Sequence, residues 1–117
     1  MSAGNNDARM LQKFVEYHTI NPHVYAVFKQ LVFERTARKK TRLQSTALMC
    51  ALRDKFELQV EGDFEFKVNQ IFGAGYVRML ELEKPETVGL FRKKESRFDA
   101  LNMLPLLAHY WKWAARI

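Results

Sequence analysis

The stretch FVEYHTINPHVYAVF, residues 14 to 28, decides how the chain begins to fold. Its apolar residues follow helical spacing on both sides of Asn21 and Pro22. This spacing predicts one helix over about residues 7 to 19 and a second over about residues 22 to 39. Asn21 is a residue type that caps helices, and Pro22 suits the first helical position, where its missing N–H costs nothing. The sequence therefore predicts two helices separated by a break.

Downstream of this pair, a helical pattern gives way to an extended one. Thr41 and Gln44 have capping-box spacing, which predicts a third helix over about residues 42 to 56. Apolar and polar residues then alternate on both sides of Gly62. This alternation predicts a short β-hairpin over about residues 56 to 68 with one apolar face.

A fourth helix is predicted over about residues 69 to 84, capped by Asn69 and ended by Pro85. Gly73 and Gly75 inside it each cost about 1 kcal/mol relative to alanine in a helix. We therefore expect the two glycines to permit a close approach of neighbouring backbone.

The expected fold class is mainly α with one short β-hairpin. The order of the elements resembles a helix-turn-helix core with an enlarged turn, that is, a winged-helix-like single domain over residues 1 to 97. A chain of 117 residues with 48% hydrophobic content can bury one core and is too short for two. Residues 98 to 117 are expected to add a C-terminal amphipathic helix.

The C-terminal helix begins at about Pro105 and is apolar over more than half its circumference. It is predicted to complete either the core or a homodimer interface, and the dimer is favoured because paired half-sites suit DNA binding. Because Lys112 and Arg116 lie beside the tryptophans, an amphipathic membrane anchor is a less favoured alternative. The predicted dimerisation residues are Leu106, Leu107, Tyr110, Trp111 and Trp113.

The charge of the chain favours an anionic partner. Nineteen Lys and Arg residues against thirteen Asp and Glu residues give a net charge of +6, and the pI is about 9.6. This balance favours nucleic acid, although a merely soluble basic protein would show it too. Cys50 is the only cysteine, which excludes an internal disulfide and a multi-cysteine metal site. The N-terminus lacks a secretory signal and no apolar run reaches about 20 residues, so a cytoplasmic protein is expected.

A catalytic interpretation depends on the E-x-K pattern of Glu65 and Lys67, with Asp54 and Asp63 as further carboxylates for Mg²⁺. The pattern has little specificity in a charged protein, and an exposed hairpin face explains the same residues. A Mg²⁺-dependent nuclease is therefore a minor alternative, and we expect no enzyme, no cofactor and no metal site. His18, His23 and His109 are interpreted as core or capping residues rather than metal ligands.

The nucleic-acid interpretation treats the helix over residues 69 to 84 as the reading helix. Asn69 and Gln70 at its start, with Arg78 two turns further on, would reach base edges or phosphates. Acidic residues at its far end leave only its beginning able to approach DNA. The remaining basic residues predicted to contact nucleic acid are Arg38, Lys39, Lys40, Arg42, Lys67, Arg92, Lys93 and Lys94.

Residues 10 to 95 resemble a family of small proteins that recurs in tailed phages and prophages. The matching patterns are F-x-x-x-H-x-x-N-P-x-V, which begins at Phe14, and F-K-[IV]-N followed by Y-x-R, which begins at Phe66. The family has no assigned activity. The resemblance therefore implies a phage setting and the cytoplasm of a bacterial host, and it supplies no catalytic residue. The tail beyond residue 97 lies outside it.

Together these features predict a non-enzymatic nucleic-acid-binding accessory protein of phage or prophage origin, acting as a homodimer, with duplex DNA as the expected partner. The alternative is a protein-binding module that modifies or inhibits a host factor through the aromatic tail and other exposed apolar residues. The choice between DNA and RNA and the target sequence stay open at this point.

Overall fold

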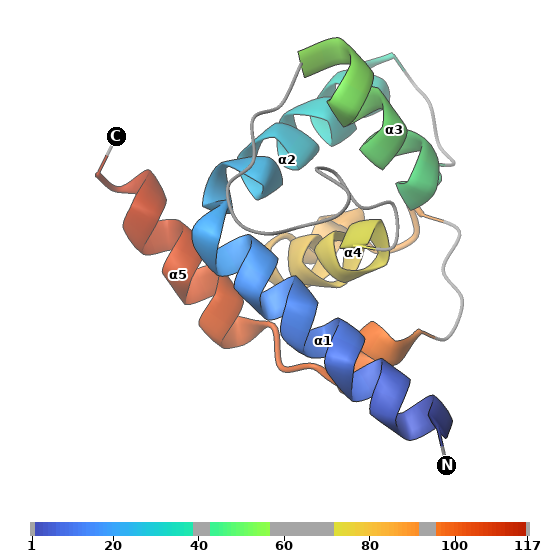
Figure 1. Cartoon of the computed structure of the whole chain (residues 1–117). Helices are drawn as coiled ribbons and strands as arrows, with labels where there is room; N and C mark the ends of the chain where they lie inside the picture. The colour runs from blue at the N-terminus through green and yellow to red at the C-terminus, as the bar shows by residue number, and fades with distance from the viewer. Residues whose placement is uncertain (1, 39–42, 57–71, 92–95, 117) are drawn as a thin grey trace.

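In a computed structural model of the chain, the described residues are 2–38, 43–56, 72–91 and 96–116, with only the backbone described for 2–7 and 53–56. They form a mainly helical single domain (Figure 1). Its elements are α1 (Ser2–Ile20), α2 (Pro22–Ala37), α3 (Ser45–Phe56), α4 (Phe72–Glu83), the 3-10 turns η1 (Pro85–Thr87) and η2 (Arg97–Ala100), and α5 (Leu104–Ala114).

The junction of α1 and α2 lies where the sequence predicts it, with Asn21 at the N-cap of α2 and Pro22 in its first turn. The Asn21 side chain nevertheless makes no capping hydrogen bond to α2. Its Nδ2 and its backbone N–H instead both donate to the carbonyl oxygen of Tyr17, at 3.2 and 2.9 Å. Asn21 is fully buried, so it closes the end of α1 and fixes the turn between the helices.

Helix α4 is the central element of the fold, because it contacts α2, α3, α5, η1 and η2. Its Gly73 and Gly75 make this packing possible. A Cβ on Gly73 would lie 3.0 Å from the backbone oxygen of Ser45 on α3, and a Cβ on Gly75 would lie 2.7 Å from Cζ of Phe14 on α1. The expected close approach of backbone is therefore confirmed at Gly73, whereas at Gly75 the close neighbour is the aromatic ring of Phe14.

The same packing buries most of α4 along its described length. A reading helix packs one face on its own domain and presents the other to the groove. In α4 the buried residues are Phe72, Gly73, Gly75, Tyr76, Val77, Met79 and Leu80. This burial gives no support to a helix-turn-helix arrangement of residues 72 to 83, since most of the segment lies in the core. Its use as a reading helix stays a prediction. Asn69 and Gln70 lie outside the described residues.

The predicted β-hairpin falls almost entirely on residues 57 to 71, outside the part of the chain that the structure describes. Within that part, the β pairing is a single isolated bridge between Leu43 and Phe91, where the Leu43 N–H donates to the Leu90 carbonyl at 2.8 Å. This bridge joins the segment before α3 to the segment after η1. It gives no support to a winged-helix arrangement.

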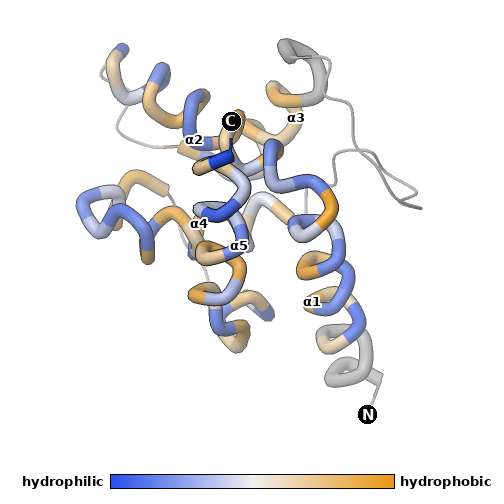
Figure 2. Tube along the Cα trace, turned by 90° about the vertical axis from the view of Figure 1, so that its left-hand side faces the viewer, coloured by the Kyte–Doolittle hydropathy of each residue, from blue (hydrophilic) through white to orange (hydrophobic). Residues whose placement is uncertain are grey.

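Helix α5 packs against α1, α2 and α4, and it runs beside α1 in both Figure 1 and Figure 2. Leu106, Leu107 and Tyr110 are at most 7% exposed within this chain. These residues of the predicted dimer interface are therefore already part of the core, since α5 packs against three other helices. Only Trp111 and the half-buried Trp113 of that predicted set reach the surface.

Candidate functional site

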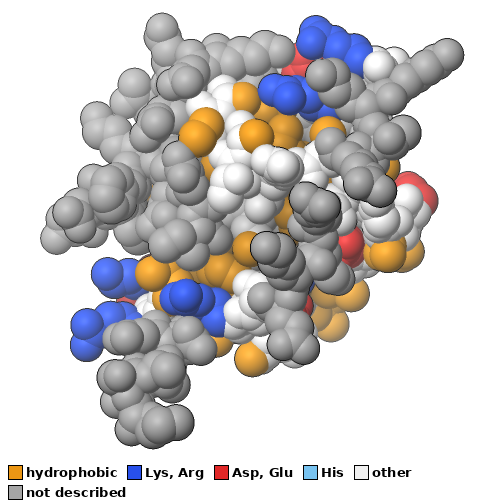
Figure 3. All heavy atoms as spheres, turned by 90° about the vertical axis from the view of Figure 1, so that its right-hand side faces the viewer, with side chains coloured by type: hydrophobic (Ala, Val, Ile, Leu, Met, Phe, Trp, Pro, Cys, Tyr) orange, Lys and Arg blue, Asp and Glu red, His pale blue; other side chains and the backbone are white. Residues whose placement is uncertain are grey.

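Most of the basic residues predicted to contact nucleic acid lie outside the described residues, namely Lys39, Lys40, Arg42, Lys67, Arg92, Lys93 and Lys94. Arg38 is described, and it lies exposed directly after α2. On the face shown in Figure 3, the Lys and Arg side chains lie in separate groups, with hydrophobic side chains between them. The described cations of this face therefore form no continuous stripe.

Arg78 has a structural role that the sequence interpretation missed. Its Nε donates to Oδ1 of Asp99 at 2.9 Å, and its Nη1 donates to the Ala74 carbonyl at 3.2 Å. The Arg78 side chain is only 11% exposed. The other Asp99 oxygen accepts the Ser96 backbone N–H and completes a capping box on η2. Arg78 therefore ties α4 to η2, and its predicted role in reading bases stays a prediction.

The residues of the E-x-K pattern, Asp63, Glu65 and Lys67, lie outside the described part, as does the side chain of Asp54. Among the described residues, no group of His, Cys, Asp and Glu could hold a metal ion. His18 is fully buried and donates from Nε2 to the Leu106 carbonyl at 2.9 Å. Burial lowers the pKa of His18 to about 4. It is a core residue.

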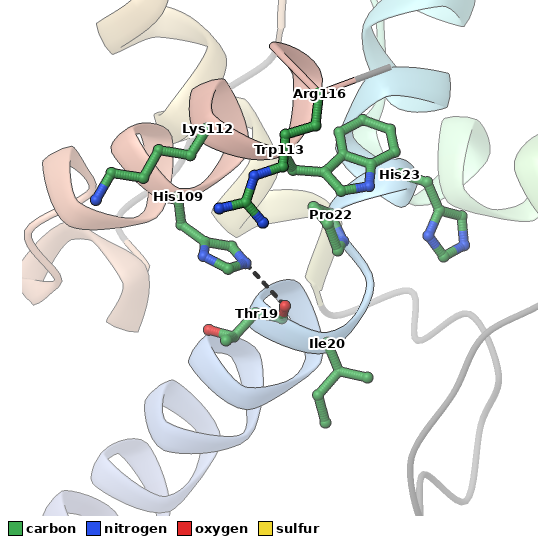
Figure 4. Close-up of a pocket in the computed structure, with 8 residues that line it drawn as sticks. All are labelled: Thr19, Ile20, Pro22, His23, His109, Lys112, Trp113 and Arg116. Atoms are coloured by element: carbon green, nitrogen blue, oxygen red, sulfur yellow. Dashed lines mark hydrogen bonds between the residues drawn. The ribbon is translucent and has the colours of Figure 1, made fainter.

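A pocket lies between the α1–α2 junction and the end of α5, with a cavity volume of about 570 Å³ (Figure 4). The chain segments that meet there are far apart in the sequence. The first contributes the end of α1 and the start of α2, and the second is one face of α5. The lining residues are Thr19, Ile20, Pro22, His23, His109, Lys112, Trp113 and Arg116.

Two faces of α5 explain how this lining is placed. Leu106, Leu107 and Tyr110 turn one face toward the core. His109, Lys112, Trp113 and Arg116 follow the i, i+3, i+4, i+7 spacing of a neighbouring face. The core contacts of the first face therefore fix the direction of the second, which borders the pocket.

His109 joins α5 to the end of α1. Its Nε2 lies 2.8 Å from the Thr19 carbonyl oxygen, as the dashed line in Figure 4 marks. Because a carbonyl oxygen only accepts, Nε2 must carry the proton in this bond. The Thr19 hydroxyl is also engaged, since it donates to the Val15 carbonyl at 2.7 Å. These bonds hold the pocket wall in place and leave its cationic side chains for a ligand.

The charged groups of the pocket are cationic. Lys112 and Arg116 are both exposed, and no carboxylate is among the described residues that line the cavity. Trp113 is half-buried, and its ring is tilted against Tyr110 at a centroid distance of 5.9 Å. An anion could therefore bind the two cations of the pocket. A flat or apolar group could contact the indole of Trp113, together with Ile20 and Pro22.

Sequence reasoning assigned these residues to other roles. Trp113 was predicted to form a dimer interface, and Lys112 and Arg116 were considered as parts of a membrane anchor. The helical spacing that joins them to His109 was visible in the sequence. The contribution of residues 19 to 23 was not, because it depends on how α5 packs against α1.

A second polar cluster joins α2, α4 and α5 around Glu83. One carboxylate oxygen of Glu83 accepts from the Tyr25 hydroxyl at 2.7 Å and from Lys29 Nζ at 3.0 Å, and the other accepts from Trp111 Nε1 at 2.7 Å. Lys29 Nζ also lies 4.4 Å from the ring centroid of Tyr110. Burial alone would raise the pKa of Glu83, but the hydrogen bonds from Trp111, Tyr25 and Lys29 hold it below its usual value.

Removing the negative charge of this cluster should destabilise the fold. We expect Glu83→Gln to lower the free energy of unfolding by about 1 to 2 kcal/mol, because charge-assisted hydrogen bonds become neutral ones. Urea denaturation at pH 7 would measure the change. Glu86→Gln removes the same charge from an exposed position and should stay within about 0.5 kcal/mol of wild type. Equal effects of the two substitutions would contradict a role for the Glu83 cluster.

Comparisons with protein-family models, with curated proteins and with solved structures gave no match. In the described part of the chain, no helix combines the length and the apolar character that crossing a membrane requires.

Proposed function

We propose that this protein is a non-enzymatic nucleic-acid-binding protein that contacts its partner through the pocket between the α1–α2 junction and α5. The observation that carries the proposal is the pairing of Lys112 and Arg116 on one cavity whose described lining contains no carboxylate. Phosphate groups are the anions that such cations bind in nucleic acids. The net charge of +6 would add a long-range attraction to the same partner.

Binding is proposed rather than catalysis because of the side chains that the described lining offers. It contains no serine, cysteine or carboxylate, and the only hydroxyl, on Thr19, donates to the Val15 carbonyl. Serine, cysteine and carboxylate nucleophiles activated by a neighbouring base are therefore not available in this lining. An origin in a tailed phage or prophage, which the resemblance of residues 10 to 95 implies, is part of the proposal.

Neutralising the pocket should weaken binding more than neutralising another surface. For Lys112→Gln/Arg116→Gln, we expect affinity for a labelled DNA strand to fall at least about tenfold at 0.1 M salt. The slope of log affinity against log salt concentration should also fall by about 0.7 to 0.9 for each lost phosphate contact. Fluorescence anisotropy at several salt concentrations would measure both.

The matched control removes the same charge elsewhere. Arg9 and Lys13 are exposed on α1 and do not line the pocket. Arg9→Gln/Lys13→Gln should therefore change affinity by less than about threefold through the general field alone. If both double variants lose the same affinity, the pocket is not the contact site. If wild type binds no nucleic acid even at low salt, the proposed function is wrong.

The alternative, a protein-binding module, is favoured by one observation. Leu104 and Trp111 lie at i and i+7 on α5 and are 54% and 45% exposed. Exposed apolar side chains on one helix face suit a protein partner, and a second copy of the chain is the simplest one. If this face forms a homodimer, sedimentation equilibrium should show a dimer that Leu104→Ser/Trp111→Ala converts to monomer. A monomer at the highest soluble concentration would exclude that use of the face.

A further inference from the structure

We infer that the pocket holds one unstacked nucleoside phosphate, with its base against Trp113 and its phosphate on Arg116 and Lys112. The inference rests on the proposed function and narrows it. It assigns the single strand, rather than the duplex expected from the sequence, as the form of nucleic acid that this site recognises.

One wall of the pocket combines an aromatic ring with a cation. Trp113 lies on α5, and Arg116 lies just past its end, where its backbone N–H donates to the Trp113 carbonyl at 3.1 Å. Figure 4 shows the Arg116 side chain directed toward the space between His109 and Trp113, with Lys112 beyond His109 at the rim. A ligand with a flat ring next to a phosphate matches this arrangement. Base stacking on aromatic residues beside cations is how proteins hold single strands without reading their sequence.

The size of the pocket and its accessibility suit one unstacked nucleotide. A cavity of about 570 Å³ lies within the range of about 300 to 1,000 Å³ that suits small ligands and cofactors. It can therefore take one nucleotide. A base in a duplex is paired and stacked, and extruding it costs a few kcal/mol. A strand whose bases are already unstacked avoids this cost, so the pocket should prefer it.

The rest of the pocket wall is apolar or held in place by a hydrogen bond. Ile20 and Pro22 offer apolar contact opposite α5, and His23 and His109 border the cavity. The hydrogen bond from His109 Nε2 to Thr19 ties this wall to α5 before any ligand arrives. Preorganised walls reduce the entropy lost on binding.

Lys112 and Arg116 also have a structural explanation. Both lie near the C-terminal end of α5, where cations stabilise a helix through its dipole. Trp113 likewise has a packing partner in Tyr110. The structural explanation predicts that substitutions of Lys112, Arg116 and Trp113 change the stability of the protein and do not change its affinity for nucleic acid. The binding explanation predicts the opposite, so each variant should be tested for both.

The experiment measures binding of a labelled twelve-residue thymidine strand and of a duplex of the same length at 0.05 M salt. We expect the single strand to bind at least about tenfold more tightly. Trp113→Leu should weaken strand binding by about 5- to 100-fold, the range for loss of one stacked base, and Trp113→Tyr should stay within about threefold of wild type. Thermal unfolding of each variant checks that the fold is kept, and Trp113→Tyr keeps the test informative if Trp113→Leu unfolds.

Competition identifies the source of the nucleotide. Adenosine monophosphate that displaces the strand at micromolar concentration would support a free nucleotide as ligand, and displacement only by oligonucleotides would support a unit within a strand. Inorganic phosphate that competes as well as adenosine monophosphate would overturn the role of the base. The inference also fails if the single strand and the duplex bind equally and Trp113→Leu has no effect on binding. If Lys112→Gln/Arg116→Gln still weakens binding in that case, the proposed function stands. Absence of any binding removes both.

Discussion

Replacing Phe14 by alanine should lower the free energy of unfolding by about 3 to 5 kcal/mol, a large part of the stability of a domain of this size. Phe14 is fully buried on α1. Its ring centroid lies 5.1 Å from those of Tyr76 and Phe98 and 5.4 Å from that of Phe72, all in edge-on geometry. The substitution removes these contacts and leaves a cavity where α1, α4 and η2 meet. Urea denaturation followed by circular dichroism would measure the loss.

A matched control is Phe33→Ala on α2, where the ring is 42% exposed. This substitution should cost less than about 1 kcal/mol, because little surface is removed from the interior. Similar losses for the two phenylalanines would contradict the placement of Phe14 at the centre of the core.

The contact between Phe14 and Gly75 makes the prediction sharper. A methyl group on Gly75 would lie 2.7 Å from the ring, so Gly75→Ala alone should destabilise the protein even though alanine favours helix by about 1 kcal/mol. In Phe14→Ala/Gly75→Ala the added methyl group enters the space that the ring has left. The combined loss should therefore be smaller than the sum of the two single losses. Agreement with the sum within about 0.5 kcal/mol would show that the two sites do not interact.

The sequence predicted the elements whose signals are local. The break at Asn21 and Pro22 separates α1 from α2 because a proline in the first helical turn acts through its immediate neighbours. The glycines in α4 were also interpreted correctly as positions of close approach. The predicted reading helix was chosen from the order of the elements, which does not show how much of the helix is buried. In the fold α4 lies in the core, with Phe72, Tyr76 and Met79 among its buried residues.

Only one of the two parts of the candidate site could be predicted from the sequence. The face of α5 that carries Lys112, Trp113 and Arg116 follows from helical spacing within one segment. Its meeting with Thr19 and Ile20 depends on tertiary packing, which a single sequence does not specify. The ion pair of Arg78 with Asp99 has the same origin. Its place two turns into the predicted reading helix made Arg78 a candidate for nucleic acid, and only the fold shows its ion pair with Asp99.

Acid should destabilise the protein through His18 by as much as about 3 kcal/mol. Burial is the main cause that holds the pKa of His18 near 4, below the 6.5 of an unperturbed histidine. The unfolded chain therefore binds more protons than the folded chain between these values. The stabilisation that comes from keeping the buried His18 neutral is complete above about pH 6.5 and is lost as the pH falls toward 4. About 2 kcal/mol should be lost by pH 5, as urea denaturation at pH 7 and pH 5 would measure.

The surroundings of His18 explain why its protonation is costly. Its Nε2 already donates to Leu106, and within the described residues its buried Nδ1 has no hydrogen-bond partner. A second proton would have to reside on Nδ1 in an aromatic environment, where Phe14 is stacked and Tyr76 is edge-on to the imidazole. A charge there loses its hydration without gaining an acceptor. The nearby His109 lowers the pKa of His18 further.

A substitution separates this effect from that of the carboxylates. His18→Gln keeps a side-chain N–H for the Leu106 carbonyl and removes the titrating ring, so its stability should change little between pH 7 and pH 5. His23→Gln, at a half-buried position of the pocket wall, should retain the acid sensitivity of wild type. Glu83 adds its own loss only below about pH 4.5, because its pKa is held below that value. Acid sensitivity above pH 5 that survives in His18→Gln would therefore have to come from another group, and the buried neutral imidazole would not be its cause.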